Sequence, residues 1–361
     1  MAEAEIVDIC VVGFGGVSCA PMFGLVLTLE TSPVAAIGAI YALALDRSQR
    51  VRITAVCRSN YDIVREHGID FVSDGFGTHS AWKPYRVVRT VADAADRSYA
   101  YVVCAFKCLP DITTTPALLA PLLTPLLANE FVLLQNGIGI EDDLLAALPV
   151  PVPVLSGCAW VDATTVDGGR KVTQFGNERL VIGAHHPPSS SPAPARAALD
   201  NFCALLRAGG AAPEATDDID AARWRKVLWN ASFSTICTLT RADVGAVLAT
   251  PSARAALADI MEEVLRVAAA ALRMPPRRRS AGGHHRAREP RVGVPPVDAR
   301  RPRGAPPHGG RGDRGRRAAA RARARRADAA LGSGVCGAGG DAERAVAGAA
   351  RGMRTAGQIP A

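Results

Sequence analysis

The sequence predicts an α/β fold in which a doubly wound, mostly parallel sheet is followed by an all-helical domain. Short apolar runs typical of buried parallel strands alternate with helical patterns over roughly the first 200 residues. A glycine-rich turn follows the first of these runs directly, and a long helical pattern replaces the alternation afterwards. With 361 residues, 48% of them hydrophobic, the chain can bury a large core and form two or three domains.

The fold is organised around residues 9–17, whose sequence is ICVVGFGGV. An apolar strand runs directly into the turn, in which the first glycine permits a tight bend and the second lets the backbone approach a pyrophosphate. The amino end of the next helix then faces the phosphates. This pattern is typical of a Rossmann-type dinucleotide-binding turn, so we predict cofactor contacts at Gly13, Phe14, Gly15, Gly16 and Val17.

The third glycine of this motif is displaced. Ser18 stands in its place, and residues 18–37 contain Pro21 and Pro33, which fit poorly inside a helix. Removing residues 18–37 joins GFGGV to GAIYALAL and makes Gly38 the third glycine. Our hypothesis is that this segment is a retained intron or a gene-model error. The alternative is a helix that begins at Ser18 and breaks at Pro33, and sequencing the transcript across the junction separates the two.

Polar residues follow the ends of the next predicted strands. Arg58 follows the second strand, where a cation suits the 2′-phosphate of NADP and an acidic residue would suit NAD. Lys107 and Asn136 follow two later strands. Because ligands of parallel sheets bind at the carboxyl ends of strands, we predict that Arg58 contacts NADP, that Lys107 meets a phosphate or a carboxylate, and that Asn136 contacts the cofactor. The family resemblance described below implies that Lys107 is also a contact to NADP. A solvated arginine and a plain Asn-Gly turn are the alternatives at Arg58 and Asn136.

The remaining pattern of the first domain predicts further elements. We expect helices at 61–67, 112–128 and 195–206, a hairpin or irregular excursion at 70–85, and strands at 154–161, 171–175 and 176–183.

A different pattern begins with residues 219–239, which predict one continuous helical run. Within it Lys226, Asn230 and Ser234 recur every four residues and are expected to share one face, next to Trp229. A polar stripe flanked by aromatic residues indicates a cleft, where burial would lower the lysine pKa and make it a usable acid near neutral pH. The alternative is an exposed lysine on a two-sided helix.

The net charge of +8 is unevenly distributed. Residues 275–361 hold 20 arginines, no lysine and 6 acidic residues, a net charge of +14, whereas the rest of the chain holds 22 basic and 28 acidic residues, a net charge of −6. The nine cysteines include no C-x-x-C pair and mostly lie in apolar runs. We therefore expect free thiols, a cytoplasmic protein and no metal site. Neither a signal peptide nor a membrane span is expected.

Residues 275–361 contain no Phe, Tyr, Trp, Lys or Asn and are built mainly from Arg, Ala, Gly and Pro. Such a segment cannot bury enough apolar surface to offset its ordering entropy, so we expect disorder. Because these four residue types share GC-rich codons, our hypothesis is a frameshift near Met274. A nucleic-acid-binding arm is the alternative, although no aromatic residues interleave the arginines for base stacking.

Four features in this order resemble the ketopantoate reductase (2-dehydropantoate 2-reductase) family over residues 6–272: the GFGGV turn, Lys107, the QNGIG segment and the WRKVLWN helix. The resemblance implies NADPH-dependent reduction of 2-dehydropantoate to pantoate, on the route to pantothenate. It implies an NADP-binding Rossmann domain over residues 1–215 and a helical substrate domain over 216–274, which is incomplete here. A homodimer is compatible with the family.

Carried over by position, the resemblance makes Lys226 the proton donor to the substrate carbonyl and Asn230 a substrate ligand. Ser234 stands where the family commonly has a second asparagine, and Ala163 aligns with a further cofactor contact. The serine and the glutamate that the family supplies from a later helix have no recognisable counterpart in this chain. An inactive NADP-binding remnant, a reductase of another 2-oxo acid, and a regulator with an RNA-binding arm therefore stay open as alternatives.

Overall fold

The computed structural model describes residues 6–14, 34–124, 127–185 and 192–272. Its centre is an 11-stranded mixed sheet with the order β5-β4-β10-β9-β8-β7-β1-β3-β6, in which β11 pairs with β10 and β2 with β9. The parallel core contains β1 (Val7–Val12), β3 (Val51–Val56), β6 (Arg86–Val88), β7 (Tyr99–Cys104) and β8 (Ala128–Leu133). The predicted α/β fold with a parallel core is confirmed.

The other strands extend the parallel core on one side. Strand β9 (Val154–Val166) runs parallel to β8, and β10 (Lys171–His185) returns antiparallel to β9 after a 3-10 turn (Asp167–Gly169). The hairpin expected over residues 70–85 is confirmed as β4 (Ile69–Ser73) and β5 (Gly77–Trp82), and β4 pairs with β10. The short strands are β2 (Val34–Ala35) and β11 (Pro213–Ala215).

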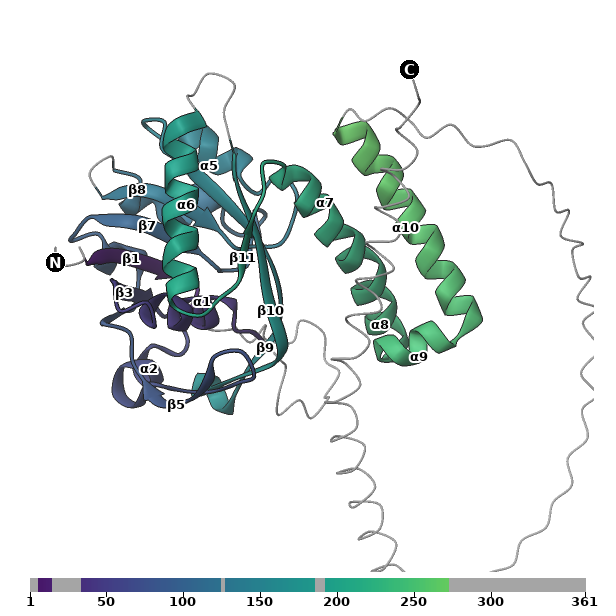
Figure 1. The fold of residues 1–361 in the computed structure, drawn as a ribbon, viewed down its shortest axis with the longest axis horizontal. Coiled ribbons are helices and arrows are strands. Elements are labelled where there is room, and N and C mark those ends of the chain that lie inside the picture. Colours follow the sequence, from purple (N-terminus) through teal and green to yellow (C-terminus); the bar gives the residue numbers. More distant parts are fainter. Residues whose placement is uncertain (1–5, 15–33, 125–126, 186–191, 273–361) are drawn as a thin grey trace, which may run out of the picture.

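Helices cover both faces of the sheet (Figure 1). On one face, α1 (Ile37–Asp46) and α6 (Pro192–Ala208) pack over the larger apolar core. On the other, the short helices α3 (Val91–Ala94), α4 (Thr115–Leu119) and α5 (Asp142–Ala147) enclose a second core. Eight successive residues of α1, from 38 to 45, are buried, which is why this helix is apolar on all sides. The small helix α2 (Tyr61–His67) has the predicted bounds.

One predicted helix and two predicted strands differ from the structure. The helix expected over 112–128 is shorter: α4 is followed by a 3-10 turn (Ala120–Leu122), and Ala128 already belongs to β8. A proline stands in the first turn of each of these two short helices, because only there does its missing N–H cost no hydrogen bond. The two strands expected at 171–175 and 176–183 are one strand, β10, with an irregularity between Phe175 and Arg179.

The last described part of the chain is helical, as predicted. It comprises α7 (Ile219–Trp229), a π turn (Asn230–Ser234), α8 (Thr235–Thr240), α9 (Val244–Ala249) and α10 (Pro251–Ala271). These helices lie to one side of the sheet, and α10 runs back alongside α7 and α8 (Figure 1). Phe233, Val247 and Leu257 form their own small core.

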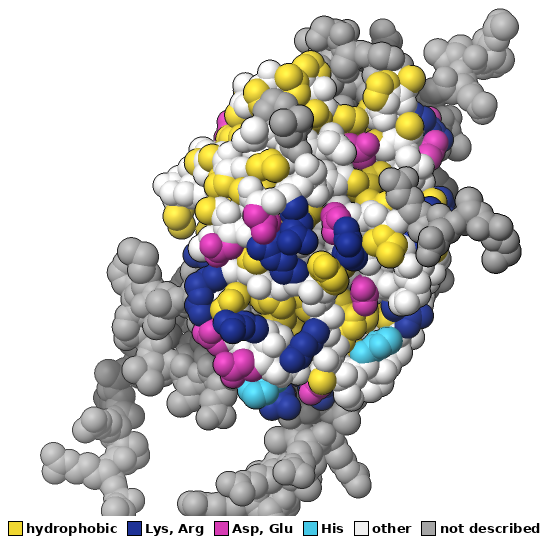
Figure 2. Space-filling view, turned by 90° about the vertical axis from the view of Figure 1, so that its left-hand side faces the viewer, with side chains coloured by type: hydrophobic (Ala, Val, Ile, Leu, Met, Phe, Trp, Pro, Cys, Tyr) yellow, Lys and Arg dark blue, Asp and Glu magenta, His cyan; other side chains and the backbone are white. Residues whose placement is uncertain are grey.

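Among the described helices, none is long and apolar enough to cross a membrane. On the face shown in Figure 2, lysine and arginine side chains are interspersed with acidic and apolar ones. Gly15, Gly16 and Val17, most of the proposed insertion at 18–37 and the segment 275–361 lie outside the described residues.

Candidate functional site

The end of β1 and the start of α1 are in direct contact. Gly13 has a φ of +98°, and a Cβ atom there would lie 2.3 Å from the backbone N of Phe106. A Cβ atom on Gly38 would lie 2.2 Å from the carbonyl O of Gly13. Both positions therefore require glycine, the first for its backbone conformation and the second for close packing of helix on strand. Gly38 thus occupies the place that the motif gives its third glycine.

The amino end of α1 is suited to an anion. No side chain caps this helix, and its first turn contains no acidic residue. The first amides of a helix lack intrahelical partners and carry the positive end of the helix dipole, so they bind phosphate readily. Ala163 of β9 lies beside this end, because its carbonyl O accepts a hydrogen bond of 3.5 Å from the N–H of Ala36.

Four neighbouring strands bring the predicted cofactor residues to one edge. Strands β8, β7, β1 and β3 are adjacent and parallel in the sheet. Their carboxyl ends are followed by Asn136, Lys107, Gly13 and Arg58 respectively. The side chains of Asn136, Lys107 and Arg58 are exposed, so they are accessible to a ligand along this edge.

Helix α7 is fixed to the same edge by Arg223, which is 2% exposed. Its guanidinium donates hydrogen bonds to the carbonyl oxygens of Gln135 (3.0 Å), Gly137 (3.1 Å) and Leu133 (3.4 Å), and to the hydroxyl of Ser156 (3.0 Å from Nε). Burial lowers the pKa of this guanidinium from its ordinary value. The helix is therefore anchored on both sides of Asn136, in the turn predicted to contact the cofactor.

One turn further along α7, Lys226 reaches the sheet. Its Nζ donates a hydrogen bond of 2.7 Å to the carbonyl O of Ala159 and lies 4.2 Å from the centre of the Trp160 ring. Strand β8 ends at Leu133, which pairs with Ser156 of β9. Ala159 therefore lies beyond the carboxyl edge of the parallel core, where ligands of such sheets bind.

Lys226 lines a cavity of about 1150 Å³ between the helical region and the sheet. Aromatic side chains form part of its wall, and several carboxylates and one arginine lie among them: Phe76, Trp160, Phe175, Trp229, Asp74, Asp162, Glu178, Glu214 and Arg179. Three of these carboxylates already have partners in the protein, because Glu178 accepts from Tyr41 (2.6 Å), Glu214 from Arg179 (2.8 Å) and Asp74 from the N–H of Gly176 (2.7 Å).

The π turn changes the predicted polar stripe. Asn230 is half-buried and follows Lys226 by one helical turn, as expected. In a π turn the hydrogen bonds join residues five apart, so the helix is wider between Asn230 and Ser234 than in its α-helical parts. Ser234, at the end of this turn, is exposed. Lys226 and Asn230 are thus both half-buried and Ser234 is exposed, and that all three share one face stays a prediction.

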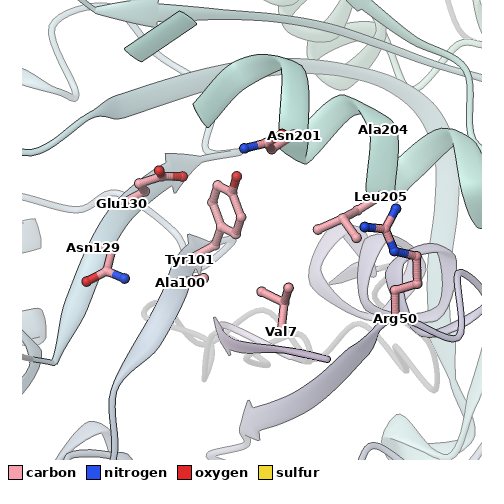
Figure 3. A pocket seen from close by; sticks show the side chains of 9 residues that line it. All are labelled: Val7, Arg50, Ala100, Tyr101, Asn129, Glu130, Asn201, Ala204 and Leu205. Carbon is pink, nitrogen blue, oxygen red and sulfur yellow. The ribbon is translucent and has the colours of Figure 1, made fainter. Parts of the chain in front are cut away.

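A second cavity, of about 350 Å³, lies at the opposite edge, where β1, β7 and β8 begin. Figure 3 shows Tyr101, Glu130 and Asn201 around it, with Arg50 at its other end. Burial raises the pKa of Glu130, and Tyr101 donates a hydrogen bond of 3.0 Å to the carbonyl O of Ala198. None of the residues predicted to bind cofactor or substrate lines this cavity.

Sequence reasoning missed Arg223 and Trp160. Arg223 precedes Lys226 by three residues, and residues three apart share one face of a helix, so this spacing was the available signal. Trp160 lies late in a long apolar strand, and nothing in such a pattern shows whether an aromatic side chain lines a cavity or packs in the core.

Comparisons with known proteins agree with this arrangement. Residues 34–187 match the family "Ketopantoate reductase PanE/ApbA", and residues 218–292 match "Ketopantoate reductase PanE/ApbA C terminal". An uncharacterized protein of Saccharomyces cerevisiae is 30% identical over 225 residues, which cover 58% of this chain and 62% of the yeast protein. The 2-dehydropantoate 2-reductase of Pyrobaculum aerophilum is 30% identical over 152 residues, 42% of this chain and 48% of that protein. The chain thus spans less than two thirds of both relatives.

Solved structures show the same fold. The 2-dehydropantoate 2-reductase of Geobacter metallireducens superposes with a TM-score of 0.58 at 22% identity, covering 73% of this chain and 76% of that one. A D-mandelate dehydrogenase in complex with NADH and anilino(oxo)acetate gives a TM-score of 0.57 at 19% identity, covering 73% and 74%. Because the amino-terminal and carboxyl-terminal parts match the two halves of one family in chain order, the chain belongs to the ketopantoate reductase PanE/ApbA family.

Proposed function

We propose that this chain is an NADPH-dependent reductase that converts 2-dehydropantoate to pantoate, with Lys226 as the proton donor. The observation that supports the proposal most directly is the position of the Lys226 ammonium group. It is held on the carbonyl O of Ala159, beyond the carboxyl edge of the sheet and on the wall of the large cavity. A 2-oxo acid in that cavity has a cation beside its ketone oxygen.

The described residues fit a dinucleotide. The close contact of Gly13 with Gly38 and the uncapped start of α1 suit a pyrophosphate, and Ala163 lies at the same place. Arg58, exposed after β3, suits the 2′-phosphate of NADP. Lys107 and Asn136 supply a cation and an amide along the same edge. When bound, the reduced nicotinamide supplies the hydride for the reaction.

The chain's own residues then hold the substrate and move one proton. The Lys226 ammonium donates a hydrogen bond to the ketone oxygen and gives up its proton as negative charge develops there. Asn230, one turn along the helix, donates an amide hydrogen bond to the same substrate. A positioned cation and an amide in a cleft stabilise the developing alkoxide without reorganisation. The Trp160 ring beneath the ammonium keeps it from turning away from the cavity.

A second candidate substrate is an aromatic 2-oxo acid such as phenylglyoxylate. Four aromatic side chains line the cavity, and rings of this kind pack well against an aryl group: Phe76, Trp160, Phe175 and Trp229. The D-mandelate dehydrogenase with the same fold was solved with the aryl ligand anilino(oxo)acetate.

NADPH oxidation by the purified chain tests the proposal, with 2-dehydropantoate and phenylglyoxylate as parallel substrates. We expect turnover of 2-dehydropantoate and a loss of kcat of about 100-fold or more in Lys226→Met, because a positioned general acid contributes about that much. The matched control is Lys83→Met, since Lys83 is an exposed lysine far along the sheet, bonded to the carbonyl O of Glu66. NADPH binding without turnover of either substrate would instead show an inactive remnant. An unchanged kcat in Lys226→Met would show that Lys226 is not the proton donor.

A further inference from the structure

Three side chains from three different elements meet away from the large cavity. Glu141 is the residue before α5, His185 is the last residue of β10, and Asp220 lies in the first turn of α7. One potential ligand atom from each lies within 4.8 Å of the others. The His185 Nδ1 is 3.8 Å from an oxygen of Glu141 and 3.8 Å from an oxygen of Asp220.

These groups face each other without hydrogen bonds. A separation of 3.8 Å exceeds the range of an N–H···O bond, so His185 bonds to neither carboxylate. Its side chain is only 8% exposed, and its Nε2 and the Glu141 Oε2 are buried with no partner among the described residues. Although Glu141 precedes a helix, its side chain does not cap that helix. Buried polar atoms of this kind are costly to leave unpaired. The atoms that converge are the His185 Nδ1 and one oxygen each of Glu141 and Asp220, and their convergence indicates a bound ion or water.

The donor set selects the kind of ligand. One imidazole nitrogen and two carboxylate oxygens suit a divalent transition metal such as zinc or manganese, whereas calcium and magnesium prefer oxygen ligands alone. Asp220, with 58% of its side chain exposed, leaves the site open to solvent on one side.

The charge balance permits a cation. Glu141, Asp220 and the nearby Asp142 contribute a charge of −3, and the guanidinium of Arg223 contributes +1. The group therefore has a net charge of about −2 before any ion binds, which a divalent ion would balance.

We propose that Glu141, His185 and Asp220 bind one divalent transition-metal ion, with zinc as the test case. The site is structural. Asp220 precedes Lys226 by six residues, or about 9 Å along the helix, so the ion does not contact the reacting groups. It joins the first turn of α7 to the sheet and to the segment before α5. This differs from the expectation, drawn from the cysteine pattern, that the chain has no metal site.

The test is zinc binding to the full-length chain after treatment with a chelator, measured by titration against a chromophoric competitor. We expect one zinc ion per chain at this site and affinity at least about 10-fold weaker in Asp220→Asn and in His185→Gln. His67→Gln is the matched control, because His67 lies 3.8 Å from Glu66 as an exposed pair. Cobalt substitution provides a second readout, with d–d absorption that lacks thiolate-to-metal charge transfer.

The outcomes are decisive whether or not the chain is an active reductase, since no substrate is used. Circular dichroism and Tm in chelator establish that each variant is folded, and the exposed Asp220→Asn is the variant least able to disturb folding. Zinc is also expected to raise the Tm of the wild-type chain and not that of His185→Gln. Absence of stoichiometric zinc, equal affinity in all four chains, or a thiolate charge-transfer band would each overturn the proposal.

Discussion

Arg223 connects α7 to the sheet through backbone carbonyls of the turn after β8. When a buried donor of this kind is removed, the acceptors it served lose their hydrogen bonds inside the protein. We therefore expect Arg223→Met to lower the free energy of unfolding by about 3 kcal/mol, measured by urea denaturation. Arg225→Met is the control, because Arg225 lies on the same helix and is only half-buried. A loss of the same size in both variants would show that the anchoring bonds contribute nothing specific.

Glu130 provides a prediction with a defined pH dependence. Burial raises its pKa above the ordinary value of 4.5, so folding favours its neutral form. The wild-type chain then loses stability, relative to Glu130→Gln, as pH rises from below 4.5 through the raised value, and the difference stays constant above it. Unfolding free energies of both chains between about pH 4 and pH 8 test this. Glu262→Gln, at an exposed position of α10, is the matched control variant.

At the residue scale, the sequence predicted the groups that follow strand ends, because a strand end is visible as the end of an apolar run. Asn136, Lys107 and Arg58 were found in this way. The partners of Arg223 and the meeting of Glu141, His185 and Asp220 could not be predicted, because each joins positions far apart in the chain. Nothing local in the sequence marks which polar residue will be buried when distant elements pack together.

At the scale of elements, the junction of β1 and α1 tests the insertion hypothesis. The hypothesis remains a proposal: Val34 and Ala35 form β2, Ala36 precedes α1 and Ile37 begins it, while residues 18–33 lie outside the described residues. Because Gly13 and Gly38 are in contact, we expect a chain without residues 18–37 to fold with an equal or higher Tm. Shortening the loop lowers the free-energy cost of closing it by roughly 1 kcal/mol, and this gain offsets the loss of the pairing between β2 and β9.

Thermal unfolding by circular dichroism compares the shortened chain with the full one. Gly38→Val is introduced into both, and we expect it to lower the Tm of both, since the added Cβ would overlap the carbonyl O of Gly13. A shortened chain that fails to fold would show that the segment is part of the domain.

Elements with strong apolar patterns were predicted closely, and those that depend on tertiary packing were not. Strands β1, β3 and β7 appear in the sequence as apolar runs, and α2 has the predicted bounds because Gly68 ends it with a φ of +75°. The π turn has no local signal, since its residues also suit an α-helix. The interruption of the helix between Asn230 and Ser234 could therefore not be predicted from residue spacing.

At the scale of the whole molecule, the excess positive charge lies in a different part of the chain from the residues proposed to form the site. All residues proposed to bind cofactor or substrate precede position 241, whereas the net charge of +14 lies in residues 275–361. The second family match runs past Met274 to residue 292, so it includes the first part of the segment that we ascribe to a frameshift.

We expect a chain ending at Met274 to keep the NADPH affinity of the full chain, measured by fluorescence titration. In low salt the full chain is expected to retain RNA weakly, through counterion release, and the shortened chain is not. A sequence-selective RNA complex that survives physiological salt would favour the nucleic-acid-binding arm over the frameshift. Translation of the other two reading frames of the DNA provides an independent check.

The hydrogen bonds that Arg223 and Lys226 donate to backbone carbonyls of the sheet region have a consequence for motion. Because the inner turns of α7 are hydrogen-bonded to the sheet, the proposed proton donor is expected to move as one body with the strands proposed to carry the nucleotide. Helix α10 packs against α7 and the π turn, and Trp229 of α7 contributes to the small core that α9 and α10 share. We therefore expect the helical region to move together with the sheet as one unit.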